Sequence, residues 1–93
     1  MVVARRLSID GRVQGVSYRG WAIETARSLG LAGWVRNRRD GTVEAVVQGD
    51  QAAVDRFIAL ARHGPPAATV DRIEAGEIDP VLGLAGFSQL PTV

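Results

Sequence analysis

Apolar and polar residues alternate near the start of the chain. Between residues 3 and 9, one face carries Val3, Leu7 and Ile9. A period of two residues is typical of a β-strand with one buried face. Arg5 interrupts this face close to the N-terminus, where strands fray. The pattern therefore predicts a half-buried strand that ends at Gly11.

Two later segments show the three- and four-residue spacing of amphipathic helices. The inner face of the first carries Tyr18, Trp21, Ala22, Thr25, Ala26 and Leu29. The inner face of the second carries Val54, Phe57, Ile58 and Ala61. We expect Ser17 and Asp50 to cap the N-termini of these helices, and Gly30 to end the first in a left-handed conformation. The second is predicted to end near His63, whose side chain we expect to cap free carbonyl groups.

Two strands, residues 33–39 and 42–49, flank a turn that contains Asp40 and Gly41. A two-residue turn would place arginines opposite valine and alanine. A three-residue turn instead pairs Asn37 with Val43 and keeps apolar residues opposite one another, with Gly41 in a left-handed bulge position. The apolar register favours the second arrangement, in which Asn37 ends the stripe that faces the core.

Residues 70–78 and 87–90 predict two further strands. Val70 and Ile73 lie an odd number of positions apart, so both can face the core only if the strand contains a bulge or twist. The last strand is short and is expected at an edge of the sheet. The element order β-α-β-β-α-β predicts an α+β fold, a ferredoxin-like sandwich with two helices on one face of a mainly antiparallel, four- to five-stranded sheet. We expect residues 1–93 to form one domain.

This topology brings together two segments that are far apart in the sequence. Strands joined through a helix run parallel, so the strand that ends at Gly11 and the strand that ends near Asn37 finish at the same edge of the sheet. The loop after Gly11 ends in Arg19. We therefore expect Arg19 and Asn37 to be neighbours.

The composition excludes several kinds of chemistry. The 93-residue chain has eleven arginines, no lysine and no cysteine. Lysine bases, Schiff bases, the lysine of a P-loop, disulfides and thiolates are therefore excluded. Asp10 is interpreted as a strand-end or turn residue, and no cluster of metal ligands is seen, so we expect no metal and no cofactor.

The charge and hydropathy of the chain also limit its partners. A net charge of +1 is too small to indicate a nucleic-acid surface. No apolar run approaches the roughly 18 residues of a membrane span, and the N-terminus lacks a signal-peptide core. We expect a cytoplasmic monomer that contacts neither membrane nor nucleic acid.

The segment Gly11–Gly20 is the strongest candidate for a binding site. Glycine-spaced turns between a strand and a helix expose backbone N–H groups, and the helix N-terminus adds partial positive charge. Arg19 supplies a forked cation that suits a phosphate. The alternative interpretation is a plain turn whose glycines serve only the bend.

The available groups limit which reaction the site can catalyse. They are an anion cradle, one arginine and one amide, and the site has no nucleophile, metal or strong acid. Without a general acid, the leaving group must depart unprotonated. A carboxylate can do so, because the pKa of its conjugate acid is about 4. The residues thus predict an acyl phosphate as substrate, attacked by a water that the Asn37 amide holds, with the phosphate itself as base.

Two long motifs resemble the acylphosphatase family. They are Gly11-Arg12-Val13-Gln14-Gly15-Val16-x-x-Arg19 and Gly33-Trp34-Val35-Arg36-Asn37-x-x-Asp40-Gly41-Thr42-Val43-Glu44-Ala45. The resemblance implies hydrolysis of the carboxyl-phosphate bond to a carboxylate and inorganic phosphate, without metal or cofactor. It implies that Asn37 positions the water and that Arg19 binds the phosphoryl group together with backbone N–H groups, those of Gly15, Val16, Ser17 and Tyr18. Gln89 departs from the pattern, because an apolar strand residue is common there.

Three alternatives remain. A related domain occurs at the N-terminus of large hydrogenase-maturation proteins and processes carbamoyl phosphate; since this chain ends at residue 93, we expect the free enzyme. The second alternative is a protein that binds phosphate but does not catalyse its release from a substrate. RNA recognition motifs share the topology, but the strand after Gly41 lacks their aromatic residues. Three arginines near Asn37 are expected to be solvated or steering charges, namely Arg36, Arg38 and Arg39.

Overall fold

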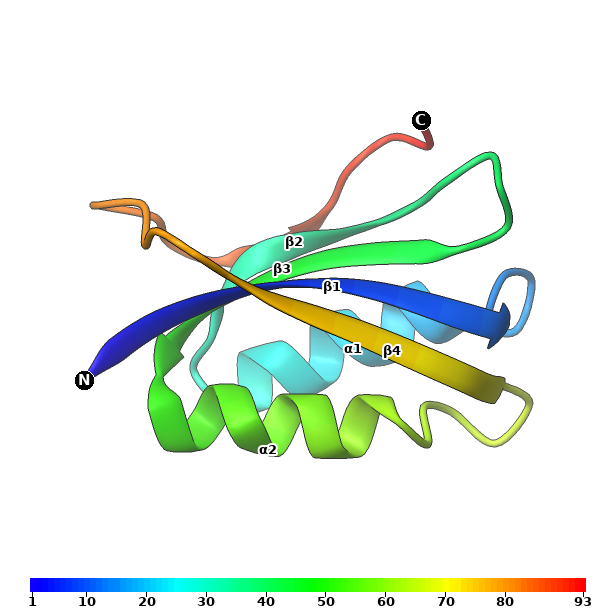
Figure 1. Cartoon of the computed structure of the whole chain (residues 1–93), viewed down its shortest axis with the longest axis horizontal. Coiled ribbons are helices and arrows are strands. Elements are labelled where there is room, and N and C mark those ends of the chain that lie inside the picture. The colour runs from blue at the N-terminus through cyan, green and yellow to red at the C-terminus, as the bar shows by residue number, and fades with distance from the viewer.

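The computed structural model describes all residues from 1 to 93 as two helices packed on one sheet (Figure 1). The elements in chain order are β1 (Val2–Arg12), α1 (Tyr18–Ser28), β2 (Ala32–Asn37), β3 (Val43–Asp50), α2 (Gln51–Ala61), β4 (Thr69–Ile78) and β5 (Phe87–Gln89). Each predicted strand and helix is present, with boundaries that differ by a few residues at most.

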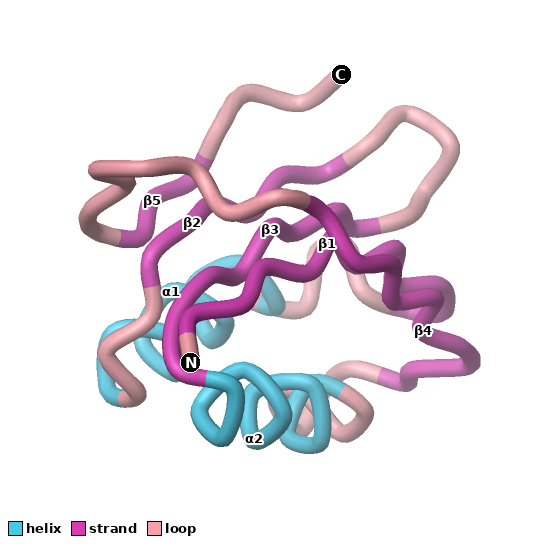
Figure 2. The backbone as a smooth tube through the Cα atoms, turned by 60° about the vertical axis from the view of Figure 1, so that its left-hand side comes forward, coloured by secondary structure: helices cyan, strands magenta, loops and turns pink.

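The sheet has five strands in the order β4-β1-β3-β2-β5. All neighbouring strands are antiparallel except β2 and β5, which run parallel. Both helices cover the same face of the sheet, and the other face is open (Figure 2). The predicted ferredoxin-like α+β sandwich is therefore confirmed.

The core lies between the helices and the sheet, because each helix turns one apolar stripe toward the strands. Ala22 and Ala26 of α1 are fully buried, and their small side chains let the helix approach the sheet closely. Phe57 of α2 fills the centre and contacts the rings of Trp21 and Phe87. The removal of these apolar surfaces from water is the main contribution to stability.

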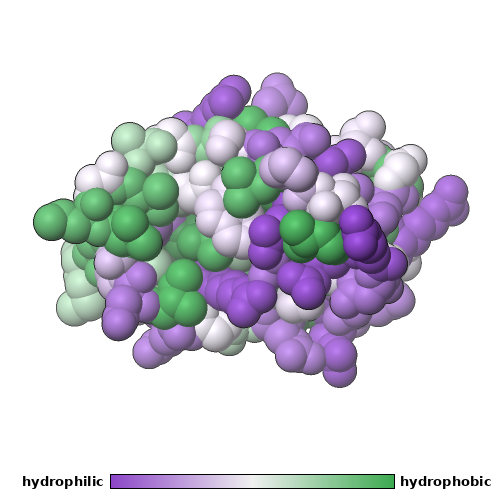
Figure 3. All heavy atoms as spheres, turned by 90° about the horizontal axis from the view of Figure 1, so that it is seen from above, coloured by the Kyte–Doolittle hydropathy of each residue, from purple (hydrophilic) through white to green (hydrophobic).

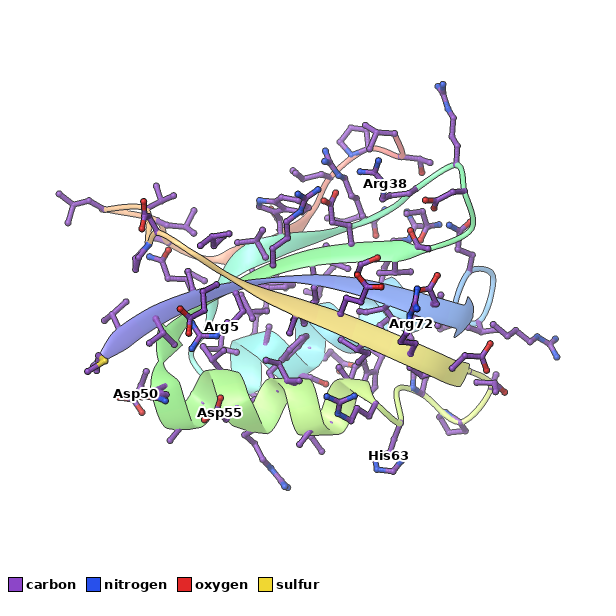
Figure 4. All side chains as sticks on the ribbon, viewed as in Figure 1. Arg5, Arg38, Asp50, Asp55, His63 and Arg72 are labelled. Carbon is purple, nitrogen blue, oxygen red and sulfur yellow. The ribbon has the colours of Figure 1, made fainter.

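The two ends of α2 are held in different ways. Asp50 accepts a hydrogen bond from the N–H of Ala52 at 3.2 Å, which confirms the predicted cap. The prediction for His63 is wrong: its side chain makes no hydrogen bond and extends away from the molecule beyond the helix (Figure 4). Two of the last carbonyl groups already have other donors: the Tyr18 hydroxyl donates to Ala61 O at 2.6 Å, and Leu60 O accepts from backbone N–H groups.

A bulge between β1 and β4 directs the chain into the loop that follows β1. The pairing register shifts between Asp10 and Gly11, and Asp71 is the extra residue on β4. A Cβ atom on Gly11 would lie 2.1 Å from Thr69 O, and its φ of 133° favours glycine. The predicted irregularity in β4 is confirmed, and it places the loop at the end of the sheet.

The C-terminal segment extends the sheet beyond β5. Leu90 N donates to Val35 O at 2.9 Å, and Val93 N donates to Asn37 O at 3.3 Å. The segment thus follows β2 as far as the β2–β3 hairpin (Figure 2). The last strand lies at an edge, as predicted. Neither helix is long and apolar enough to cross a membrane.

Candidate active site

The loop between β1 and α1 leaves its backbone donors free. Gly15 and Ser17 both have left-handed backbones, with φ of 73° and 67°, and Ser17 is the one residue other than glycine with positive φ. None of the N–H groups of residues 15–20 donates a hydrogen bond within the protein. Alternating conformations of this kind and the first turn of a helix both gather N–H groups into an anion-binding concavity.

The predicted cap of α1 is wrong in its mechanism. Ser17 occupies the N-cap position, but its side chain makes no cap hydrogen bond. An N-cap residue usually has extended backbone, whereas Ser17 has φ 67° and ψ 24°. The first N–H groups of the helix therefore stay available to a ligand.

The β2–β3 hairpin lies at the same end of the sheet as this loop (Figure 1), and Asn37 is the last residue of β2. The predicted three-residue turn is confirmed: Asn37 pairs with Val43, Arg38 N donates to Thr42 O at 2.9 Å, and Gly41 has φ 94°. The side-chain Oδ1 of Asn37 is buried and has no hydrogen-bond partner. A buried acceptor of this kind normally binds a water or a ligand.

A cavity of about 140 Å³ joins these two segments. Its lining consists of Val13, Gly15, Ser17, Tyr18, Arg19, Gly20, Asn37 and Gln89. Arg19 and Asn37 both line the cavity and are thus neighbours, as the parallel direction of β1 and β2 predicts. Val16 does not line the cavity, because its side chain is buried in the core. Since a water occupies roughly 30 Å³, the cavity has space for one tetrahedral anion and a water.

Arg19 is the uncompensated charge of this cavity. It makes no ion pair, and its guanidinium makes no hydrogen bond in the protein. No carboxylate lines the cavity. A forked cation next to free N–H groups attracts an anion with several oxygen atoms.

The arginines on either side of Asn37 face the opposite side of the sheet. Arg36 Nε donates to Glu44 Oε1 at 2.7 Å, and Arg38 and Arg6 also contact this carboxylate. The prediction that Arg36 and Arg38 are solvated or steering charges is therefore wrong. Arg39 is exposed and its side chain makes no polar contact.

Glu44 is only 2% exposed, although it is charged. Burial raises the pKa of Glu44, but hydrogen bonds from Arg6 and Arg36 outweigh that effect and hold the pKa below its usual value. The same cluster borders a larger hollow of about 450 Å³ on the open face of the sheet. Two arginines and three carboxylates line that hollow, so it lacks the uncompensated positive charge of the smaller cavity. Figure 3 shows this face to be mostly hydrophilic, with apolar atoms gathered at one end.

Sequence reasoning missed two features near the site. Gln14 donates two hydrogen bonds from the β1–α1 loop to the hairpin, at 2.7 Å to Arg38 O and 2.9 Å to Thr42 O. Its only signal was a polar residue between apolar ones in the loop. The second missed feature is the cluster of arginines around Glu44. The predicted three-residue turn contains a signal for it, because that register places Arg36 directly opposite Glu44.

Known proteins of the same family match both the sequence and the fold. The sequence model of the acylphosphatase family matches residues 5–89. An acylphosphatase of Azoarcus sp. (strain BH72) is 59% identical over 91 residues, which are 98% of this chain and 92% of the relative. The crystal structure of acylphosphatase from Bacillus subtilis has a TM-score of 0.91 at 37% identity, and the match covers 97% of this chain and 99% of that one.

The same fold also occurs within a much larger protein. In full-length HypF, whose crystal structure is in a phosphate- and nucleotide-bound form, the match has a TM-score of 0.89 at 26% identity. It covers 99% of this chain and 12% of the HypF chain.

The fold and the cavity define a ferredoxin-like α+β protein with a candidate anion-binding site at one end of its sheet. The family match extends over most of the chain, and its relatives are matched over most of their own length. The chain therefore belongs to the acylphosphatase family, and its resemblance to that family is confirmed. The protein is a hydrolase of the acylphosphatase type.

Proposed function

We propose that Arg19, Asn37 and the N–H groups of Gly15–Tyr18 carry the acylphosphatase activity of this chain. The observation that supports the proposal is a single small cavity that combines an unpaired guanidinium, free backbone donors and a buried amide oxygen without a partner. Each of these groups lacks a partner in the protein. An acyl phosphate together with one water would provide the missing partners of all of them.

In this proposal, Arg19 and the loop bind the phosphoryl group. The guanidinium donates to two phosphoryl oxygens, and the N–H groups of Gly15, Val16, Ser17 and Tyr18 donate to the same group. These donors are fixed before the substrate arrives, because α1 and the left-handed residues set their directions. Negative charge that gathers on the phosphoryl oxygens in the transition state is therefore stabilised without reorganisation.

Asn37 holds the attacking water in the same cavity. Its Oδ1 accepts a hydrogen bond from the water, which turns an oxygen lone pair toward phosphorus. The water oxygen bonds to phosphorus while the bond from phosphorus to the acyl oxygen breaks. The water proton passes to a phosphate oxygen, and a carboxylate leaves with the bonding electrons.

This chemistry needs neither a general acid nor a metal, because the leaving carboxylate is a weak base with a conjugate-acid pKa of about 4. We propose that the chain acts without a cofactor on small acyl phosphates and releases inorganic phosphate. We further propose a single domain over residues 1–93 that works as a cytoplasmic monomer without a nucleic-acid partner, as the composition suggests.

The proposal is tested by hydrolysis of benzoyl phosphate with the purified chain in excess chelator. An aryl phosphate monoester serves as the control, because its phenolate leaving group is a much stronger base than a carboxylate. We expect turnover of benzoyl phosphate alone. Binding of inorganic phosphate without turnover would instead indicate a phosphate-binding domain, and turnover that the chelator abolishes would contradict the metal-free mechanism.

A further inference from the structure

Gln14 connects the two halves of the candidate site. Its side-chain Nε2 donates to Arg38 O at 2.7 Å and to Thr42 O at 2.9 Å, so both amide protons are used. Gln14 lies in the loop directly before Gly15, whereas Arg38 directly follows Asn37. One side chain thus spans from the phosphate loop to the strand end that carries the proposed water-binding amide.

The two acceptors belong to the closing pair of the hairpin turn. Arg38 N donates to Thr42 O at 2.9 Å, and Gly41 N donates to Arg38 O at 3.1 Å. Thr42 is also held within the turn, because its N–H and hydroxyl both donate to Asp40 Oδ1. The turn therefore moves as one unit, and Gln14 is attached to that unit.

No other hydrogen bond joins residues 13–17 to residues 36–43. Apart from Gln14, these two segments contribute apolar side chains to the common core, among them Val13 and Val43. Apolar contacts tolerate small displacements, whereas two hydrogen bonds from one planar amide fix both distance and direction.

The loop has its own anchor on the other side. Tyr18 is buried, and its hydroxyl donates to Ala61 O of α2 at 2.6 Å. Loss of the Gln14 amide would thus leave the loop attached to the helices and would remove the hydrogen bonds that fix the tip of the hairpin relative to the loop.

We propose that Gln14 is a positioning residue that sets the separation between the phosphate loop and Asn37. The inference rests on the function proposed above. Since neither proton of the Gln14 amide is free, Gln14 contributes to the placement of the water and not to the binding of phosphate. A displacement of about 1 Å in a reacting group is enough to lower a rate roughly 100-fold.

The test compares Gln14→Met with Gln48→Met. Methionine has a similar length and no donor. Gln48 is a matched control, because its amide also holds a loop, through hydrogen bonds with the backbone of Val81 at 2.8 and 2.9 Å, and does not line the cavity. We expect Gln14→Met to lower kcat for benzoyl phosphate roughly 10- to 100-fold, with the inhibition constant of inorganic phosphate within about threefold of the original. Gln48→Met should keep its kcat.

A double-mutant cycle with Asn37→Ala separates this inference from the proposed function. If Gln14 acts through Asn37, Gln14→Met has almost no further effect on kcat once Asn37 is alanine. Full additivity, or an equal loss of phosphate binding, would overturn the positioning role while the role of Asn37 stands. An unchanged kcat in Asn37→Ala alone would overturn both.

Gln14→Glu gives a second readout that does not depend on the stability of the methionine variant. An ionised glutamate repels the two carbonyl groups, whereas a protonated one donates to one of them. The kcat of this variant, relative to the original chain, should therefore rise as the pH falls through the pKa of the new carboxyl group. A ratio that does not change with pH would contradict the hydrogen-bonding role.

Discussion

Arg19 and Asn37 bring different chemistry into the same cavity. Arg19 carries a full charge without a carboxylate partner. No group of the protein therefore neutralises the guanidinium, which stays available to an anion. Asn37 is neutral, and its buried Oδ1 has no hydrogen-bond donor in the protein. In the proposed mechanism, the cation stabilises the phosphoryl group in every state, whereas the amide acts on the water alone. The two residues should therefore respond differently to substitution.

Arg19→Ala is expected to abolish both phosphate binding and turnover, because the cavity then loses its only charged side chain. The measurements are kcat/KM for benzoyl phosphate and the inhibition constant of inorganic phosphate. Arg39→Ala is the matched control, since Arg39 is exposed and its side chain makes no polar contact. A normal rate and normal phosphate inhibition in Arg19→Ala would remove Arg19 from the site.

Asn37→Ala is expected to retain phosphate inhibition and to lose roughly 2.7–4 kcal/mol of transition-state stabilisation, which is about 10²–10³ in kcat. The reason is that the phosphate-binding groups stay in place while the water loses its acceptor. Circular dichroism and a thermal melt check that the hairpin is still folded. The proposed role fails if kcat is unchanged in a folded variant.

At the scale of elements, α1 serves the site through its first turn. The helix begins without a side-chain cap, so its N-terminal N–H groups and their partial positive charge face the cavity. Ser17 adopts a left-handed backbone that disfavours a side chain by about 1–2 kcal/mol. The Tyr18 hydroxyl, which is bound to α2, keeps this strained turn in place. The helix is thus anchored by packing instead of by its cap.

Ser17→Gly is therefore expected to raise the free energy of unfolding, by up to about 1 kcal/mol, and to retain phosphate binding. Glycine adopts the left-handed backbone without strain, and the proposed contact uses the N–H group, which the substitution keeps. Urea unfolding measures the change. Ser28→Gly within α1 makes the same chemical change at a helical residue and should be destabilising. Equal losses of stability in both variants would contradict strain at Ser17.

The elements could be predicted from the sequence because their signals are local. The parity of Val70 and Ile73 indicated the bulge, and apolar pairing across the turn gave the register of Asn37 with Val43. The neighbourhood of Arg19 and Asn37 followed from a separate rule: strands joined through a helix run parallel, so β1 and β2 end at the same edge of the sheet.

The errors concern contacts that depend on tertiary structure. A serine before a helix usually caps it, but here the loop imposes a left-handed backbone on Ser17. His63 caps neither Leu60 O nor Ala61 O, because the backbone of the turn and Tyr18 from another helix donate to these two groups. Local patterns contain no information about such distant partners.

At the scale of the whole molecule, Glu44 forms ion pairs with three separate segments on the open face of the sheet. It lies on the central strand β3 and contacts Arg6 of β1, Arg36 of β2 and Arg38 of the turn. Because its pKa is lowered in the folded protein, the ionised form favours folding. This stabilisation is present above the pKa of unfolded glutamate, about 4.3, and is lost as the pH falls through the lowered pKa of the folded state.

Glu44→Gln is expected to lower the free energy of unfolding by about 2 kcal/mol at pH 7, because hydrogen bonds to a charged group are lost. The difference from the original chain should shrink as the pH falls below about 4, where the original glutamate also becomes neutral. Urea unfolding at several pH values measures it. Glu77→Gln should have little effect at any pH, because the Glu77 side chain is 84% exposed in its ion pair with Arg5. A pH-independent difference for Glu44→Gln would contradict this account.

The small volume of the cavity has a consequence for substrate choice. In the proposed mode of binding, a cavity of about 140 Å³ accommodates the phosphoryl group and a water but leaves no space for an acyl chain, which extends into solvent. The protein then has few means of distinguishing one carboxylic acid from another by shape. Reactivity across a series of substrates should follow the acidity of the departing acid, so that a plot of log kcat/KM against its pKa is a straight line.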